Sequence, residues 1–478
     1  MSATIASNAF IASAGRIVGG VFALFTTIFT TRALGTTGFG EYSTAVAFLY
    51  IFNAVADFGL YSYLVREISR TKSDERSIVG HVITLRMAFL VVLLVAGIFI
   101  GQMLPYPEVV KRGMVFAALS YFFLSSSQVL MGLFQRYLVI WKAAVAEIVS
   151  RSIQLAFVCF LFFSGETKIE AFLGILALAS FVNFLAVIFF ARQHTTFTFG
   201  VSWSAWKTIA KESFPIALSL IFTLIYFRLD TVLLSLFKSA HEVGIYNISY
   251  KLLENIIFYP AMFVGLLMPA LSREAEKQSE RFAELLQKGS KTLFAVAVPM
   301  VFGGAILARP IIEIVGGTAF HEAQQPFVVL LVATAFIFFG TIAGAAVIAL
   351  NKQKQALPIY FCAMVFNVLV NLVFIPQYGY MATALTTLAT EIIVTVGLCG
   401  VVGVRKILPH PTFAIKVFLA GAIMATPLLL LFNSLYGSIG LVFLVPAMVG
   451  GPIVFFTALV ALGGFSREDF DFLFGRIH

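Results

Sequence analysis

Apolar runs of about 20 residues, separated by short polar segments, follow one another along the whole chain. A helical run of this length matches the hydrocarbon thickness of a bilayer, and a helix satisfies its own backbone hydrogen bonds where no water is present. The composition agrees, because 60% of the residues are hydrophobic and 12% are charged, against about 25% charged in soluble domains. The sequence therefore predicts an all-α polytopic membrane protein with about fourteen spanning helices, near residues 9–33, 42–64, 82–104, 113–135, 143–163, 170–191, 212–236, 243–268, 291–316, 327–350, 357–375, 380–404, 413–432 and 439–463.

Lysine and arginine are unevenly distributed between these spans. Of the 32 such residues, 21 lie on the side that holds both chain ends, six lie on the other side and five lie within spans. Because loops rich in lysine and arginine stay in the cytoplasm, we expect both termini to be cytoplasmic. The same rule accounts for the net charge of +9, so we expect no nucleic-acid partner.

A weak internal repeat relates the two halves of the chain. Residues 39–49 (FGEYSTAVAFL) align with residues 243–253 (VGIYNISYKLL), which places Gly40 opposite Gly244 at an offset of 204. This offset covers six spans, so both copies cross the membrane in the same direction. Parallel repeats predict two six-helix bundles related by an axis along the membrane normal, with a cleft between them. The predicted divisions are an N-terminal lobe at 1–200, a C-terminal lobe at 201–406, and an added helix pair with a cytoplasmic tail at 407–478.

Five basic residues lie inside the predicted spans: Arg16, Arg86, Arg151, Arg228 and Lys251. Each costs about 2.5–3.5 kcal/mol at a helix centre, so a membrane protein retains it only where it faces protein or water. These residues therefore predict a water-filled interior suited to an anion.

Arg16 and Asp57 lie at similar depths from the cytoplasmic ends of the first two spans, judged by the rise of about 1.5 Å per residue. An ion pair between them is therefore geometrically reasonable. Two interpretations remain open for this pair. It fixes helix packing, or it takes part in transport, either by opening when an anion arrives or through titration of Asp57 with ion coupling.

Arg228 and Asp230 lie in the outer half of the seventh span, and Lys251 and Glu254 lie at a comparable level in the eighth. Positions two apart do not share a helix face, so one of Arg228 and Asp230 can face a cavity while the other contacts a neighbouring helix. We predict that Arg228 and Lys251 line the cleft, with a structural role as the alternative. Asp230 and Glu254 are candidates for ion coupling or gating.

The remaining charged residues in spans have simpler interpretations. Glu147 precedes Arg151 by four residues, a favourable pairing on a helix, so we expect Arg151 to be structural. Arg86 falls within about one turn of the predicted cytoplasmic boundary and is expected to extend to water. Glu391, near the middle of the twelfth span, has no evident partner in the sequence and is a candidate for ion coupling.

The sequence holds no pattern typical of covalent catalysis. It contains no Walker loop, HExxH motif or nucleophile elbow, and its six histidines fall in loops or at helix ends. Cys159, Cys362 and Cys399 lie in apolar runs without disulfide or metal-ligand spacing. We therefore expect no catalytic residues, no metal and no cofactor.

Three segments resemble oligosaccharide flippases of the Wzx or polysaccharide-exporter type, within the broader multidrug/oligosaccharidyl-lipid/polysaccharide superfamily. The segments are residues 31–70 (TRALGTTGFGEYSTAVAFLYIFNAVADFGLYSYLVREISR), 228–252 (RLDTVLLSLFKSAHEVGIYNISYKL) and 351–393 (NKQKQALPIYFCAMVFNVLVNLVFIPQYGYMATALTTLATEII). In the third segment, Asn367 and Asn371 stand where the family pattern expects them, and Ala382 replaces a usual glycine. Together the segments span most of the chain in the family's order.

The resemblance implies a V-shaped pair of six-helix lobes that works by alternating access and is not an enzyme. The implied cargo is an oligosaccharide linked to a polyprenyl diphosphate of the undecaprenyl type, such as an O-antigen, capsule or exopolysaccharide repeat unit. It would move from the cytoplasmic to the outer leaflet of the bacterial inner membrane. Relatives hold the diphosphate with cationic residues in the cleft, including ones on the first helix, where Arg16 lies in this chain. Implied partners are membrane lipids, a glycan polymerase and assembly proteins.

Two other functions remain open. A multidrug or metabolite/cation antiporter of the same superfamily would have an acidic cleft, whereas the intramembrane charges of this chain include more bases than such a transporter would need. A membrane glycan polymerase or ligase would carry a sizeable outer loop with catalytic residues, and the predicted outer loops are short.

Overall fold

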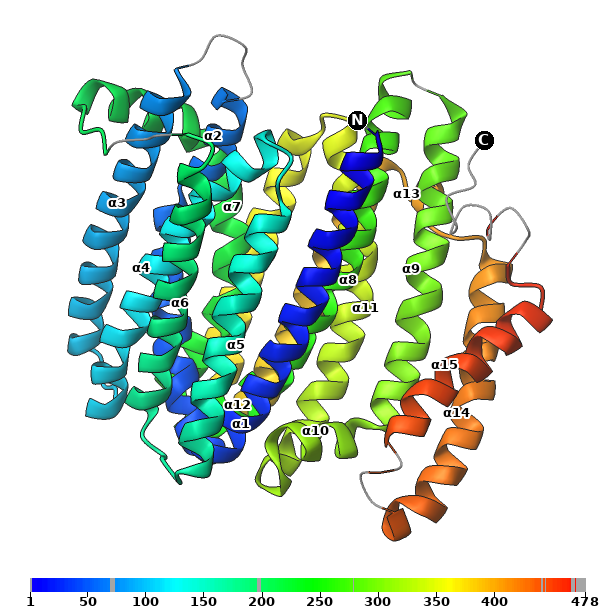
Figure 1. Ribbon diagram of the computed structural model, residues 1–478. Helices are drawn as coiled ribbons and strands as arrows, with labels where there is room; N and C mark the ends of the chain where they lie inside the picture. Colours follow the sequence, from blue (N-terminus) through cyan, green and yellow to red (C-terminus); the bar gives the residue numbers. More distant parts are fainter. Residues whose placement is uncertain are drawn as a thin grey trace. The chain divides into compact units, whose positions relative to one another are not determined.

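The computed structural model describes residues 2–68, 74–195, 199–277, 279–439, 442, 444–465 and 469. The side chains of residues 2–14, 16, 215–216, 218–227, 405–406 and 433–439 lie outside this description. All regular structure in the described ranges is helical (Figure 1). The helices are α1 (Ser2–Asp57), α2 (Leu60–Ile68), α3 (Glu75–Met103), α4 (Glu108–Arg136), α5 (Trp141–Phe163), α6 (Ile169–Arg192), α7 (Trp203–Phe237), α8 (Ala240–Glu276), α9 (Glu280–Ile306), α10 (Ala308–Gly316), the 3-10 helix η1 (Thr318–Ala323), α11 (Gln324–Ala349), α12 (Gln353–Val402), α13 (Val404–Ile407), α14 (Pro411–Ile439) and α15 (Leu444–Ala461).

Eleven helices in these ranges are long and apolar enough to cross a membrane. Two of them are too long for one crossing, because α1 has 56 residues and α12 has 50. At a rise of 1.5 Å per residue these lengths are about 84 and about 75 Å, against about 30 Å of hydrocarbon. Each of the two helices must therefore supply two spans.

A glycine with a positive φ divides each long helix. Gly35 in α1 has a φ of 63° and Gly379 in α12 has a φ of 55°, a backbone conformation that glycine adopts without steric cost. With both helices divided, and with α7 enclosing the predicted run at 212–236, the helices account for the predicted spans. The predicted all-α polytopic fold is confirmed.

Two positions that the predicted repeat aligns, Gly40 and Gly244, take part in one close backbone contact. A Cβ atom placed on Gly40 in α1 would lie 1.7 Å from the carbonyl oxygen of Ala240 in α8, and one placed on Gly244 would lie 2.0 Å from that of Thr36. Gly244 follows Gly40 by the same interval in the sequence as Ala240 follows Thr36. The contact is therefore reciprocal between the aligned positions of the two copies.

The chain forms two compact units, Met1–Asn247 and Ile248–His478. Helix α7 packs on α1 and belongs to the first unit, although the repeat would make it the first helix of the second lobe. The division between the units falls within α8 rather than at residue 200. The predicted lobes group the helices by sequence repetition, whereas the units group them by contact. The lobes therefore stay a prediction.

Small polar residues hold the first unit together. Helix α4 packs against α6, and α1 packs against α5. Between α4 and α6, the hydroxyl oxygens of Ser120 and Ser180 are 2.8 Å apart, and Ser127 Oγ donates to Asn183 Oδ1 at 3.1 Å. Small residues let membrane helices approach closely and form hydrogen bonds between them. These contacts fix α4, whose Gln128 lines a polar cavity in this unit.

The second unit is built around α11, which packs against α12 and α9. A buried polar ladder joins the two halves of α12: Asn371 Nδ2 donates to Asn367 Oδ1 at 3.2 Å, and Asn367 Nδ2 donates to Thr390 Oγ1 at 3.3 Å. Helices α14 and α15 pack against each other, and α14 packs on α9. Met424 and Phe455 are buried in that packing. The last two spans are thus attached through α9.

Candidate functional site

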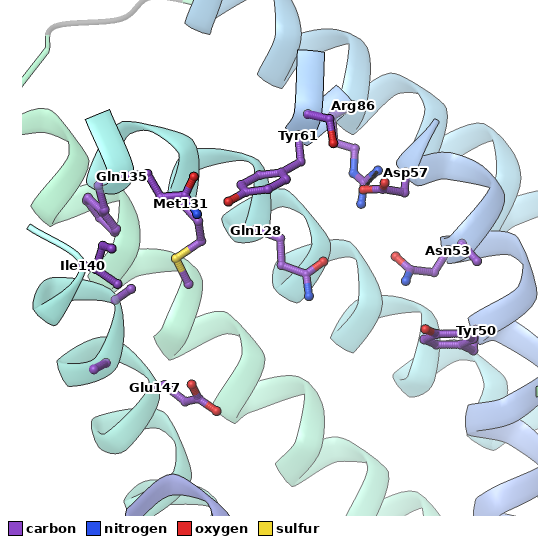
Figure 2. Close-up of a pocket in the computed structure, with 15 residues that line it drawn as sticks. Tyr50, Asn53, Asp57, Tyr61, Arg86, Gln128, Met131, Gln135, Ile140 and Glu147 are labelled. Carbon is purple, nitrogen blue, oxygen red and sulfur yellow. Dashed lines mark ion pairs between the residues drawn. The ribbon is translucent and has the colours of Figure 1, made fainter. Parts of the chain in front are cut away.

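A polar cavity of about 470 Å³ lies within the first unit (Figure 2). Residues of α1, α2, α3, α4 and α5 line it. Helix α1 ends at Asp57, which lines the cavity. The chain then turns into α2 through Phe58, with a φ of 44°, and Gly59, with a φ of 68°. A positive φ is costly for a bulky residue such as Phe58, and backbone strain of this kind concentrates at functional sites.

A buried ion pair between Arg86 and Asp57 forms one wall of this cavity. Arg86 Nη1 lies 2.8 Å from Asp57 Oδ1, and Arg86 Nη2 donates to Ser125 Oγ in α4. The arginine side chain is only 1% exposed, and its buried Nε has no hydrogen-bond partner. The pair thus joins α1, α3 and α4, and the Nε donor of the guanidinium is left without a partner.

The expectation that Arg86 extends to water is wrong. The predicted span began at residue 82, which placed Arg86 about one turn from the boundary. Helix α3 in fact begins at Glu75, where Asp74 Oδ1 accepts from the Ser77 amide at 3.3 Å and caps it. Arg86 therefore lies about 17 Å along the helix from its first residue, too deep to reach its end.

The predicted partner of Asp57 was Arg16, whose side chain lies outside the described residues. Its neighbours on α1 show where this stretch packs. A Cβ atom on Gly15 would lie 2.6 Å from Ala144 Cβ, and one on Gly19 would lie 3.6 Å from Glu147 Oε1. Both contacts are with α5, and both Ala144 and Glu147 line the cavity. The Arg16–Asp57 pair stays a prediction.

Two side chains of α1 line the cavity next to Asp57. Asn53, one helical turn earlier, has a buried Oδ1 without a hydrogen-bond partner. Tyr50 precedes Asn53 by three residues, and the guanidinium carbon of Arg228 lies 5.0 Å from the centroid of its ring, a cation–π distance. Tyr50 therefore both lines the cavity and contacts Arg228 of α7.

Asp230 has a different environment from Arg228, as expected for positions two apart. It is buried, and its Oδ2 accepts a hydrogen bond from the Tyr246 hydroxyl at 3.3 Å. Beside it, Thr231 Oγ1 donates to Asn247 Oδ1 at 3.2 Å. These contacts tie the end of α7 to the start of α8.

Glu147 and Arg151 pair along α5 as predicted, with 3.8 Å between Glu147 Oε1 and Arg151 Nε. The same arrangement occurs in the second unit, where Lys251 Nζ lies 2.8 Å from Glu254 Oε2. Both pairs remain partly exposed, so each leaves polar atoms accessible to water or to a ligand. Glu391, in contrast, is buried in the second half of α12.

The described ranges contain no group of three or more His, Cys, Asp or Glu residues placed to hold a metal ion. Cys159, Cys362 and Cys399 are free thiols. The cavity offers instead one buried guanidinium, two carboxylates and neutral amide and hydroxyl groups. This set suits a polar ligand that forms many hydrogen bonds.

Comparison with known proteins assigns the family. Residues 5–274, more than half of the chain, match the family described as polysaccharide biosynthesis protein. The chain belongs to this family. A second family, MatE, matches residues 215–373. Membership in the polysaccharide biosynthesis family confirms the resemblance seen in the sequence.

Curated relatives of this family member are similar over about a third of their length. One is the "Probable flippase AglR" of Haloferax volcanii, 24% identical over 167 residues that cover 34% of this chain and 35% of the relative. Another is the "Probable low-salt glycan biosynthesis flippase Agl15" of the same organism, 22% identical over 163 residues, or 34% of each chain.

Solved structures share the fold over nearly the whole family member. The "Lipid II flippase MurJ, inward closed conformation" has a TM-score of 0.79 at 15% identity, covering 94% of this chain and 98% of the other. The Vibrio cholerae MATE transporter VcmN in the bent form has a TM-score of 0.54 at 13% identity, covering 85% of this chain and 98% of the other. At these identities the likeness concerns the fold alone.

Proposed function

We propose that this protein is a flippase that moves a polyprenyl-diphosphate-linked oligosaccharide from the cytoplasmic to the outer leaflet of a bacterial inner membrane by alternating access. The observation that carries the proposal is the polar cavity of the first unit, where a buried Arg86–Asp57 pair lies beside an unsatisfied amide oxygen of Asn53. Sugar and diphosphate groups lose their hydration in hydrocarbon. A polar cavity inside a bundle of spanning helices supplies replacement hydrogen bonds.

The family, the flippase names of the partial relatives and the fold similarity to a lipid II flippase support this function. In the proposal, Arg16, Arg228 and Lys251 bind the diphosphate. Contact with the Tyr50 ring holds the Arg228 guanidinium in place, and a guanidinium is suited to bidentate recognition of phosphate.

The acidic residues Asp57, Asp230, Glu254 and Glu391 are proposed to couple ions or gate the transport cycle. Because Glu254 is paired with the partly exposed Lys251, binding of an anion to Lys251 would release the Glu254 carboxylate for protonation. Asp57 is partly exposed, so a proton can reach it directly from the cavity. The membrane potential supplies about 2.3 kcal/mol per charge for each 100 mV, so one coupled proton is enough to bias such a step. The glycan is proposed to be an O-antigen, capsule or exopolysaccharide repeat unit.

A second candidate is a multidrug or metabolite/cation antiporter, which the MatE match favours. Two carboxylates, Asp57 and Glu147, line the cavity and would suit a cation. Each is already paired with an arginine, however, so a cation would first have to displace that arginine. The flippase is therefore the preferred function.

The test is translocation of a fluorescent polyprenyl-diphosphate oligosaccharide in vesicles that contain the purified protein. Arg228→Gln and Lys251→Gln are expected to slow translocation, and Arg16→Gln tests the third proposed ligand. Arg112→Gln is the matched control, because Arg112 is exposed at the start of α4 and pairs with Glu170 outside the cavity. Efflux of an organic cation without movement of the glycan lipid would establish the antiporter instead.

A further inference from the structure

A second hollow of about 420 Å³ lies on the first unit between α3 and the first turns of α7. Leu85, Phe89 and Val92 of α3 form one side, and Trp203 and Trp206 of α7 form the other. It shares no residue with the polar cavity. Its lining is almost entirely apolar, and Lys207 is the charged residue in it.

The hollow opens toward the lipid-facing side of α3. Val92 is 66% exposed and Trp203 is 79% exposed. Apolar residues that contact acyl chains in the membrane have such high exposed fractions when the lipid is absent. Helix α7 is fixed against α3, because Ile209 of α7 is buried in the same hydrophobic core as Leu85 of α3. The hollow is therefore a stable feature of the packing between α3 and α7.

Trp206 contributes its indole ring to this hollow. The ring nitrogen Nε1 is buried, with almost no exposed surface and no hydrogen-bond partner. A ligand in the hollow would therefore contact the carbon atoms of the indole.

A positive charge lies at the hollow. Lys207 is exposed and lines it. Within the described part of the chain no ion pair engages Lys207, and the nearby Glu212 is paired with Arg66. A cation beside an apolar groove is complementary to an amphiphile with an anionic head.

We propose that this hollow binds one anionic glycerophospholipid of the surrounding membrane. Its acyl chain lies along Leu85, Phe89 and Val92, and its phosphate lies beside the exposed Lys207 Nζ. The site lies at the end of the helices where lysine and arginine are concentrated, which favours anionic lipid. The inference does not depend on which substrate the protein transports.

Quenching of tryptophan fluorescence by brominated lipid tests the site directly. The chain has 3 tryptophans, so Trp141→Phe with Trp203→Phe leaves Trp206 as the reporter. The full-length protein is placed in phosphatidylcholine vesicles containing an equal mole fraction of either acyl-brominated phosphatidylglycerol or acyl-brominated phosphatidylcholine. We expect brominated phosphatidylglycerol to be preferred about fivefold, the factor that corresponds to one lysine at an anionic lipid surface.

Lys207→Gln is expected to remove this preference while leaving the size-exclusion profile unchanged. Lys211→Gln is the matched control, because Lys211 is exposed one turn away and lines no part of the hollow; it should retain the preference. Equal quenching by the two brominated lipids, or a preference that survives Lys207→Gln, would overturn the proposal. Displacement of brominated phosphatidylglycerol by added polyprenyl diphosphate would also overturn it, by assigning the hollow to that lipid.

Discussion

Arg86 and Asp57 form an ion pair of 2.8 Å that links α3 to the end of α1 at the wall of a polar cavity. The arginine is almost completely buried, whereas the aspartate is 24% exposed. The pair therefore has one partner fixed in the protein and one that faces the cavity. A polar ligand that reaches the cavity meets the carboxylate, and through it affects the charge balance around the arginine.

Removing one member of this pair should cost more than removing a surface pair. Arg86→Met leaves Asp57 without its partner, and the free energy of unfolding is expected to fall by about 3–5 kcal/mol. Arg66→Met, which breaks the exposed pair with Glu212, is the matched control and should cost about 1 kcal/mol or less. Thermal unfolding in detergent measures both. Equal losses would show that the buried pair has no special role.

The double variant Arg86→Met with Asp57→Asn should be more stable than Arg86→Met alone, because no uncompensated charge remains. A double-mutant cycle over the two positions measures this coupling. Additive losses would mean that each residue acts through other contacts, such as the hydrogen bond from Arg86 to Ser125.

The ring of Tyr50 is expected to position Arg228 for substrate. Tyr50→Leu removes the aromatic face, and loss of about 1 kcal/mol of cation–π interaction corresponds to a translocation rate about fivefold lower. Tyr50→Phe keeps the face and should retain the rate, which makes it the matched control. If the phenylalanine variant were as slow as the leucine variant, the hydroxyl rather than the ring would be the functional group.

Acidification should destabilise the first unit through His194, which follows α6. Burial is the main cause that lowers the pKa of His194, and the neighbouring Lys142 lowers it further, while Glu75 raises it. Lys142 Nζ donates to His194 Nε2 at 2.8 Å, which requires a neutral ring at that nitrogen. The Tyr137 ring stacks on the imidazole at 4.8 Å between centroids.

The sign follows from proton binding. A histidine with a lowered pKa binds fewer protons in the folded protein than in the unfolded chain near pH 6.5 and just below, so stability falls as pH drops through the unfolded value. The melting temperature should therefore decrease between pH 8 and about 5.5. His194→Gln should reduce this decrease, because a glutamine does not titrate. An unchanged pH profile in that variant would assign the effect to other groups.

The glycine crossing of α1 and α8 should tolerate no side chain. Gly40→Ala or Gly244→Ala would place a methyl group within about 2 Å of a carbonyl oxygen, and the expected loss of stability is at least about 1–3 kcal/mol. Gly20→Ala in α1 is the matched control, because a Cβ atom there meets nothing within 4 Å. Equal melting temperatures for Gly20→Ala and Gly40→Ala would contradict the close approach.

The fold was predictable from the sequence because hydrophobic runs and glycine-marked turns are local signals. Gly35 and Gly379 fall between predicted spans, and the structure shows a positive φ at both. The cavity was less predictable. Arg86 was misplaced because polar residues from Glu75 onward belong to α3 although they lack the apolar character of a span.

Neutral residues of the cavity gave no signal in the sequence. Tyr50, Asn53 and Gln128 carry no charge, and only packing shows that they line one space. The pairing of Glu147 with Arg151 was predictable, since both lie on one helix four residues apart. The pair between Asp57 and Arg86 was not, because it joins helices whose relative rotation depends on tertiary contacts.

The reciprocal crossing at Gly40 and Gly244 affects how the sequence of this chain can evolve. In a homodimer of half-length proteins, one gene would encode both sides of such an interface, and every substitution would appear twice. Here the two sides occupy separate positions of one chain, so each can change alone. The flanking residues show this divergence, because Thr36 Oγ1 contacts His241 Nδ1 at 2.9 Å, whereas its counterpart Ala240 has no hydroxyl group to form such a contact.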